Sequence, residues 1–133
     1  MVEYRDSVEG LSEYDFEGFC IGWGRPLTGH ELMRVLQGSH YVGIALRGGR
    51  VIGFVNAVSD GVFMAFIPLL EVRPDEQGQG IGSELVRRAM ERYRAFYGVD
   101  LLCDEGLVPF YSRLGMTQVT GMVSRNRSFQ FDQ

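Results

Sequence analysis

The chain has 133 residues and an apolar content of 45%, so we predict a single domain, residues 1–133, around one hydrophobic core. Its net charge of −4 disfavours a dedicated nucleic-acid or anionic-membrane surface, and all 13 of its positive residues are arginine. Its first residues hold no apolar leader and no stretch approaches a membrane span, which predicts a cytoplasmic protein.

Cysteine and histidine are scarce. Cys20 and Cys103 are too few and too far apart for a disulfide framework, a zinc knuckle or a redox pair. His30 and His40 are equally unsuited to a metal site, so no metal is expected.

In the first third of the chain the pattern predicts one strand and two helices. Residues 2–5 fit a short strand, and the apolar spacing of residues 11–22 fits a helix loosely. Thr28 and Glu31 have the spacing of a capping box, which predicts a second helix that ends near Gly38.

The middle of the chain predicts an antiparallel meander. Residues 41–47 and 50–59 are rich in Val and Ile and are joined by Gly48-Gly49, which is typical of a hairpin. After a turn at Asp60-Gly61, residues 62–72 predict a third, long strand.

Helical spacing then predicts a helix over residues 83–97, followed by a short buried strand over residues 99–103. Strand, helix and strand in this order predict a parallel pair with a right-handed crossover. Residues 107–114 predict a last short helix that Gly115 terminates.

A glycine turn lies between the long strand and the following helix, at Gln77-Gly78-Gln79-Gly80-Ile81-Gly82. Glycines permit close approach, and backbone N–H groups at a helix start bind anions, so the turn predicts a phosphate site. A Walker loop is disfavoured because the chain contains no lysine. The glycine spacing also fails the dinucleotide-binding pattern.

This hexamer resembles the Arg/Gln-x-x-Gly-x-Gly/Ala signature of the GNAT superfamily of acyl-CoA N-acyltransferases, whose loop holds the pyrophosphate of coenzyme A. Residues 70–74 look like that superfamily's preceding strand, and residues 108–116 are similar to its Phe-Tyr-x-Lys-Leu-Gly-Phe segment. The resemblance implies an α/β fold: a central, mixed, mostly antiparallel twisted sheet flanked by helices, with a splayed parallel strand pair that holds the cofactor. It also implies direct acetyl transfer from acetyl-CoA to a primary amine of a small molecule or peptide, in a ternary complex.

The resemblance implies a set of residues that contact coenzyme A along the strand, the loop and the last helix. They are Leu70, Val72, Gln77, Gly78, Gln79, Gly80, Ile81, Gly82, Ser83, Phe110 and Arg113. Gln77 replaces the commoner Arg and adds no charge, and Arg113 stands where Lys is usual.

Acyl transfer needs a proton donor for the thiolate, donors for the oxyanion and an acceptor for the amine proton. The resemblance places the Tyr111 hydroxyl beside the sulfur, as the acid. The superfamily binds the oxyanion with backbone N–H groups where this strand splays from its neighbour, and Pro68 interrupts the strand at that place. The resemblance therefore implies that the amides of Leu69 and Leu70 bind the oxyanion.

The base is less clear, because Phe66 and Pro68 stand where relatives often carry a carboxylate or histidine. Glu71 is the next candidate, since burial in an apolar run would raise its pKa. Asp104 and Glu105 are alternative bases or ligands for the amine, and proton loss to water is a further alternative. Asp104 also stands where the superfamily often has Asn.

Trp23 and Phe66, with Phe19 and Arg25, are candidates for the acceptor pocket. Cys103 as an acyl-accepting nucleophile is disfavoured, because no histidine is placed to activate it. Two other functions stay open: a catalytically silent acyl-CoA-binding regulatory module, and a structural protein whose loop binds nothing. The superfamily usually closes with two long strands, so the short tail after Met116 predicts a homodimer that completes the sheet.

Overall fold

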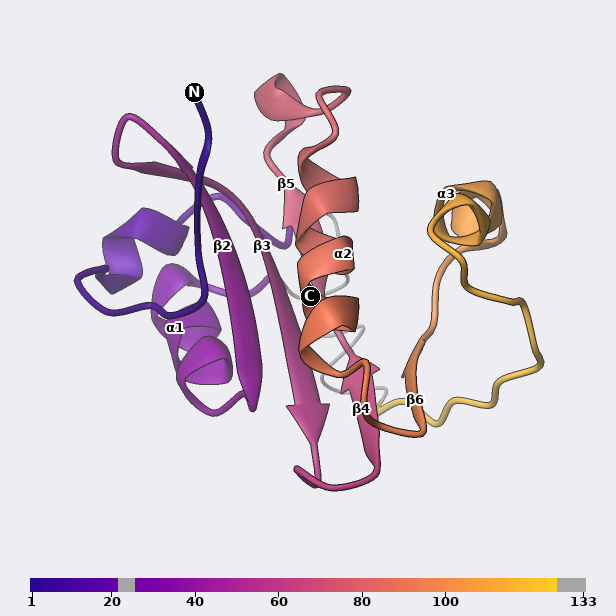
Figure 1. Ribbon diagram of the computed structural model, residues 1–133. Helices are drawn as coiled ribbons and strands as arrows, with labels where there is room; N and C mark the ends of the chain where they lie inside the picture. Colours follow the sequence, from indigo (N-terminus) through magenta and orange to yellow (C-terminus); the bar gives the residue numbers. More distant parts are fainter. Residues whose placement is uncertain (22–25, 127–133) are drawn as a thin grey trace.

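The computed structural model describes residues 1–21 and 26–126, and these form an α/β fold around a six-stranded sheet (Figure 1). The strands follow the order β1-β2-β3-β4-β6, and β5 pairs with β3 beside β4. In chain order the elements are β1 (Glu3–Arg5), α1 (Gly29–Gln37), β2 (Tyr41–Arg47), β3 (Arg50–Ser59), β4 (Met64–Ile67), β5 (Leu70–Val72), α2 (Ile81–Arg92), β6 (Gly98–Leu101) and α3 (Val108–Arg113).

The hairpin of β2 and β3 forms as predicted. Gly48 and Gly49 have φ of 58° and 82°, the left-handed pair that a two-residue hairpin turn requires. The register shifts between Ala45 and Leu46, so that Ile52 is an extra residue in β3. Such a bulge changes the direction in which the strand end presents its side chains.

The long strand predicted over residues 62–72 is wrong, because the chain forms two shorter strands there. Pro68 has no N–H to donate, and the N–H of Leu69 donates to the side-chain Oδ1 of Asn56 at 3.1 Å. β4 pairs antiparallel with β3 and parallel with β6, whereas β5 pairs only with β3. The mostly antiparallel sheet with one parallel, splayed pair is therefore confirmed.

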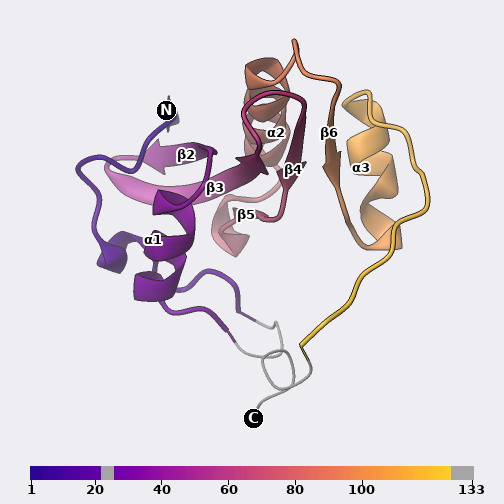
Figure 2. The ribbon, with the colours of Figure 1, turned by 90° about the horizontal axis from the view of Figure 1, so that it is seen from below.

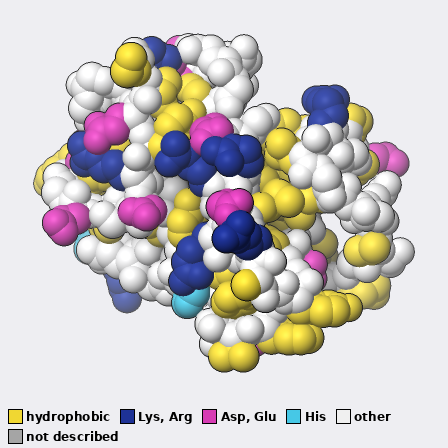
Figure 3. All heavy atoms as spheres, in the orientation of Figure 1, with side chains coloured by type: hydrophobic (Ala, Val, Ile, Leu, Met, Phe, Trp, Pro, Cys, Tyr) yellow, Lys and Arg dark blue, Asp and Glu magenta, His cyan; other side chains and the backbone are white. Residues whose placement is uncertain are grey.

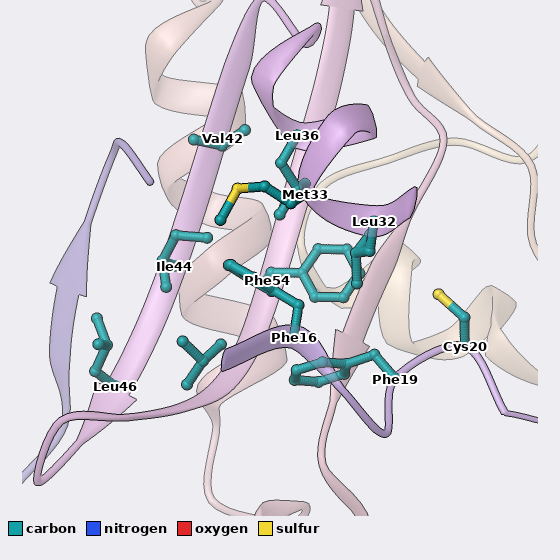
Figure 4. Packing of buried hydrophobic residues seen from close by; sticks show 11 residues of the cluster. Phe16, Phe19, Cys20, Leu32, Met33, Leu36, Val42, Ile44, Leu46 and Phe54 are labelled. Atoms are coloured by element: carbon teal, nitrogen blue, oxygen red, sulfur yellow. The ribbon is translucent and has the colours of Figure 1, made fainter. Parts of the chain in front are cut away.

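The two longer helices lie on opposite faces of the sheet (Figure 2). α1 begins with the predicted capping box, in which Thr28 Oγ1 accepts from Glu31 N–H and Glu31 accepts from Thr28 N–H. Its apolar side packs with β2 and β3, as Figure 4 shows for Leu32, Met33 and Phe54. α2 covers the other face through Ile81, Leu85 and Ala89, and Tyr93, directly after its end, belongs to the same core.

The helix predicted over residues 11–22 is also wrong, since the described part of that range holds only a 3₁₀ turn, Glu13–Phe16. Gly18 and Cys20 then take left-handed φ values of 88° and 61°, which a right-handed helix cannot contain. The apolar residues instead belong to an irregular segment in which the side chains of Phe16 and Phe19 are fully buried. The Phe19 ring packs edge-on against Phe54 (Figure 4).

The later helices differ from the prediction mainly at their ends. α2 begins at Ile81 rather than at residue 83, and it ends at Arg92 before a series of turns. A 3₁₀ turn, Glu105–Leu107, precedes α3. Gly115 ends α3 as predicted: its φ is 94°, and Met116 N–H donates to Tyr111 O at 3.1 Å, which is a Schellman motif.

Beyond α3, residues 117–126 form no strand, and the chain curves away from α3 and returns toward β6 (Figure 1). A Cβ placed on Gly121 would lie 2.7 Å from Leu102 Cδ2, directly after β6. The described part of the tail thus adds no strand to the sheet, and the predicted homodimer stays a prediction. Across the described ranges, no helix combines the length and the apolar character needed to cross a membrane.

The outer face of α2 carries arginine and glutamate side chains (Figure 3). Arg87 and Arg88 donate hydrogen bonds to the Glu84 carboxylate, and these bonds lower the pKa of Glu84 from 4.5 to about 2. A lowered pKa in the folded state stabilises the fold above pH 4.5, and this contribution is lost as the pH falls toward 2.

Replacing Glu84 by Gln should therefore lower the free energy of unfolding by about 1 kcal/mol at neutral pH, a modest loss because solvent screens a surface pair. The loss should shrink progressively between pH 4.5 and pH 2, as measured by urea denaturation. Glu91→Gln is the control, since Glu91 pairs with Arg94 through more exposed side chains and should change nothing measurable. A deficit for Glu84→Gln that persists undiminished near pH 2 would contradict the assignment.

Candidate functional site

The glycine turn joins β5 to the start of α2. Gly78 and Gly80 have φ of 80° and 81°, and a Cβ at either position would meet no atom within 4 Å. Both glycines are therefore needed for backbone conformation, and their outer side is open. The first N–H groups of α2, from Ile81 onward, have no partner within the helix and carry its positive dipole end. This arrangement suits a bound phosphate or pyrophosphate.

The register of β5 sets the direction of its backbone groups. Arg73 N–H donates to Ile52 O at 2.8 Å and Asn56 N–H donates to Leu69 O at 3.2 Å, so residues 69, 71 and 73 face β3. In an antiparallel ladder the residues between them point the other way. Leu70 and Val72 therefore direct N–H and C=O away from β3, toward the side on which β6 has separated from β5.

The third segment at the site is α3. A Cβ placed on Gly82 would lie 3.6 Å from Phe110 Cζ and 3.8 Å from Val72 Cγ2. The start of α2, the end of β5 and the first turn of α3 thus meet at Gly82. Three segments that resembled one family's motifs separately are brought together by the fold.

Tyr111 follows Phe110 on α3, and the two rings are 4.8 Å apart and nearly perpendicular. Tyr111 is half-buried and lines a hollow of about 1070 Å³ together with Phe66 and Cys103. The hollow lies along β6 and α3 and does not reach the glycine turn. Burial, and secondarily Cys103, raises the pKa of Tyr111 above its ordinary value of 10, so the phenol keeps its proton at neutral pH.

Of the two backbone N–H groups expected to bind an oxyanion, only one points to the open side of β5. The choice of Leu69 is wrong, because its N–H is already bonded to the side chain of Asn56. Leu70 N–H points to the open side of β5, so its assignment as donor stays a prediction supported by the register.

The carboxylate of Glu71 has a partner on residues 17–21, the irregular stretch after the 3₁₀ turn Glu13–Phe16, which we call the front segment. Both of its oxygens accept from the backbone N–H of Cys20, at 3.0 and 2.8 Å. Glu71 lies opposite Phe54, whose side chain belongs to the α1-side core, whereas Leu70 and Val72 pack on the α2 side. Burial, and secondarily Glu71, raises the pKa of the Cys20 thiol to about 12, so that thiol is inert at neutral pH.

Polar residues of the turn are engaged with one another. Gln77 Nε2 donates to Val72 O at 3.0 Å, which covers the carbonyl that β5 directs away from β3. Gln79 hydrogen-bonds to Glu76 and Arg47. Ser83 lies in the first turn of α2.

The remaining candidates lie at the rim or outside the described residues. Asp104 and Glu105 are exposed between β6 and α3, and Arg113 is exposed in the last turn of α3. Phe66 lies on β4 opposite Asp100 of β6. Trp23 and Arg25 lie outside the described residues. Within the described ranges no cluster of metal-ligating side chains occurs.

Sequence reasoning missed three polar residues that shape the site: Asn56, Glu76 and Arg47. Asn56 is only 1% exposed and stands in an otherwise apolar strand, a local signal that pointed to a buried hydrogen bond. The contact of Glu76 with Arg47 joins positions far apart in the chain, for which the sequence offers no local signal.

Comparison with known proteins gives a consistent result. The family model described as the acetyltransferase (GNAT) family matches residues 9–116. The GCN5-related N-acetyltransferase 2, chloroplastic, of Arabidopsis thaliana is 32% identical in an alignment 130 positions long, gaps included, that covers 79% of this chain and 50% of that protein. The chain thus spans about half the length of this curated relative.

Two solved structures are similar over nearly the whole chain. A candidate acetyltransferase from Deinococcus radiodurans R1 is 40% identical, with a TM-score of 0.93 over 98% of this chain and 92% of that one. A GNAT-family acetyltransferase from Streptococcus pneumoniae is 29% identical, with a TM-score of 0.75 over 96% and 99% of the two chains. The family model spans most of the sequence. The glycine turn, β5 and α3, which resemble the family's motifs, also meet in the structure. The chain therefore belongs to the acetyltransferase (GNAT) family.

Proposed function

We propose that the chain transfers an acetyl group from acetyl-CoA directly to a primary amine, with both substrates bound together. The observation that carries the proposal is the meeting of the left-handed glycine turn, the outward-facing amides of β5 and the first turn of α3 around Gly82. The open side of the turn fits a pyrophosphate, and the free edge of β5 fits an amide-bearing chain such as pantetheine.

The residues present fit acetyl-CoA in three places. The turn and the first amides of α2 would hold the pyrophosphate, Leu70 and Val72 would hydrogen-bond to pantetheine, and Phe110 would form an apolar wall. Bound acetyl-CoA supplies a thioester whose carbonyl is open to attack by an amine. Val72 O already accepts a hydrogen bond from Gln77 Nε2 at 3.0 Å and, with two lone pairs, can accept one from a pantetheine N–H as well.

Two groups of this chain suit the chemistry. Leu70 N–H donates toward the developing oxyanion, and Tyr111, protonated at neutral pH, donates a proton to the departing sulfur. Phe66 and Pro68 accept no proton, and the Glu71 carboxylate is bonded to Cys20 N–H. We therefore favour loss of the amine proton to water, or to the exposed Asp104 or Glu105.

The acceptor that we favour is a cationic small-molecule amine. The net charge of −4 and the exposed carboxylates of Asp104 and Glu105 beside β6 attract a protonated amine. The experiment is thiol release from acetyl-CoA against a panel of polyamines, amino sugars and peptides, with calorimetry of coenzyme A binding in parallel. Turnover with one class supports the transferase, and absence of both heat and turnover overturns it.

A second function, a silent acyl-CoA-binding module, is favoured by the apolar side chains at Phe66 and Pro68. It predicts coenzyme A heat without turnover across the whole amine panel. This result would retain the reading of the glycine turn and reject the transferase.

Gly80→Ala should weaken coenzyme A binding at least tenfold, since the added Cβ both strains the turn and obstructs phosphate approach. Gly10→Ala is a matched control: both glycines have φ of 81°, and at both a Cβ would meet no atom within 4 Å. Each variant should lose about 1–2 kcal/mol of stability from the left-handed backbone. Calorimetry should show an affinity loss for Gly80→Ala alone, and an equal loss in both variants would refute a direct phosphate contact.

Tyr111→Phe should lower kcat about 100-fold, because it removes the proton donor and keeps the ring. The Kd for coenzyme A should stay within about twofold of the wild-type value. Tyr97→Phe, at a tyrosine that is 78% exposed, is the control and should leave both constants unchanged. Undiminished kcat in Tyr111→Phe would remove this residue from the mechanism.

Glu71→Gln separates a base from a structural contact. A base would cause a fall in kcat of about 100-fold or more and would shape the acidic limb of the pH–rate profile. We expect the other result: a stability loss of about 1–2 kcal/mol from the weakened bond to Cys20 N–H, with a change in kcat below about tenfold. Thermal denaturation and a pH–rate profile of the same preparation decide between them.

A further inference from the structure

Glu76 is a buried carboxylate at the base of an anion-binding turn. Its residue is 9% exposed, and with Asn56 it is one of two buried polar residues in the described core. It ends the 3₁₀ turn Pro74–Glu76, directly before Gln77. A buried negative charge close to a phosphate site is unfavourable unless a cation compensates it.

Arg47 supplies that cation from the far end of β2. Its Nε lies 3.2 and 3.3 Å from the two Glu76 oxygens, and its Nη2 lies 3.2 Å from Oε1. The same Nη2 donates to Gln79 Oε1 at 2.9 Å, and Gln79 Nε2 donates to Glu76 Oε1 at 3.2 Å. The three side chains therefore form a closed triangle, which we call the brace.

The brace acts on the part of the turn that needs fixing. Gln79 lies between Gly78 and Gly80, both of which have left-handed φ. Glycine has more unfolded-state freedom than any other residue, so a turn that contains two of them is costly to order. Tying Gln79 to Glu76 and Arg47 restrains the backbone between the glycines before any ligand binds.

The β2–β3 hairpin is directed toward the turn. Arg47 and Arg50 are cross-strand partners and so share one face of the hairpin. Arg47 reaches Glu76 and Gln79, and Arg50 Nη1 binds Asp75 Oδ2 at 3.1 Å. The bulge at Ile52 lies two residues after Arg50, next to the hairpin turn, where it alters the direction of the strand.

We propose that Arg47, Glu76 and Gln79 are positioning residues that hold the glycine turn in its pyrophosphate-binding conformation. This rests on the proposed function in one respect, namely that the ligand is the diphosphate of coenzyme A. None of the three needs to touch the acyl group or the amine. The brace therefore governs affinity for the nucleotide part and leaves the chemical step alone.

The brace is tested with two readouts, one on the ligand-free protein and one on the protein with coenzyme A. Amide hydrogen exchange of residues 77–83 without ligand reports the order of the turn, and calorimetry with coenzyme A reports affinity. Glu76→Gln and Arg47→Met should each speed exchange in this range and weaken coenzyme A binding about tenfold or more. Arg47→Met should lose more, because it leaves the Glu76 charge without its partner beneath the anion site.

Matched controls come from the same two segments. Arg50→Met and Asp75→Asn break a pair whose side chains are 51% and 64% exposed, and they should change neither readout. Arg47→Lys keeps the charge but not the planar fork, so it should restore part of the affinity. If Arg47→Met fails to fold, Glu76→Gln, which preserves shape, carries the test.

Two results would overturn the brace: exchange unchanged in both brace variants, or faster exchange with unchanged coenzyme A affinity. If the wild-type protein shows turnover, Glu76→Gln and Arg47→Met should raise the KM for acetyl-CoA. They should leave kcat and the amine KM within about twofold of the wild-type values. If the wild-type protein shows no coenzyme A heat, the proposed function fails, and the exchange data still decide whether the brace orders the turn.

Discussion

The separation of β5 from β6 is the constraint on which the site depends. Pro68 cannot donate to a ladder, and Asn56 takes the N–H of Leu69 with its side chain. β4 stays with β6, while β5 continues along β3 alone. A backbone edge is thereby left free inside the domain rather than at its periphery, next to the start of α2. An uninterrupted strand would have paired with β6 and closed the place that a ligand chain requires.

The same strand also holds the front of the domain. Glu71 binds Cys20 N–H, and the Arg73 guanidinium donates to the carbonyls of Val51, Glu17 and Asp15 at 2.6, 3.0 and 3.2 Å. β5 therefore presents Leu70 and Val72 toward the predicted cofactor and uses the alternate residues to fix the segment that leads to residues 22–25. These hydrogen bonds therefore fix the front segment to β5 and to Arg73 directly after it.

The sequence predicted correctly those turns and helix ends that are determined by residues a few positions apart. The Gly48-Gly49 turn, the Thr28 capping box, Gly115 and the glycine turn each act within a few residues, and each is confirmed in the structure. The long strand over residues 62–72 failed partly for a local reason, because Pro68 interrupts it, and partly because the distant Asn56 side chain takes the N–H of Leu69. The helix over residues 11–22 failed where a carboxylate 51 positions away binds the backbone at Cys20. Apolar periodicity indicates which residues are buried. It does not indicate which backbone groups will form hydrogen bonds with a side chain far away in the sequence.

The arginines on the outer face of α2 have a chemical consequence for a protein that is proposed to handle an activated thioester. A guanidinium stays protonated and is a poor nucleophile, whereas a lysine amine reacts with acyl thioesters. With arginine at every basic position of the sequence, no side-chain amine is available for acylation. Ion pairs such as that of Arg88 with Glu84 would thus keep their charge in prolonged contact with the proposed acyl donor.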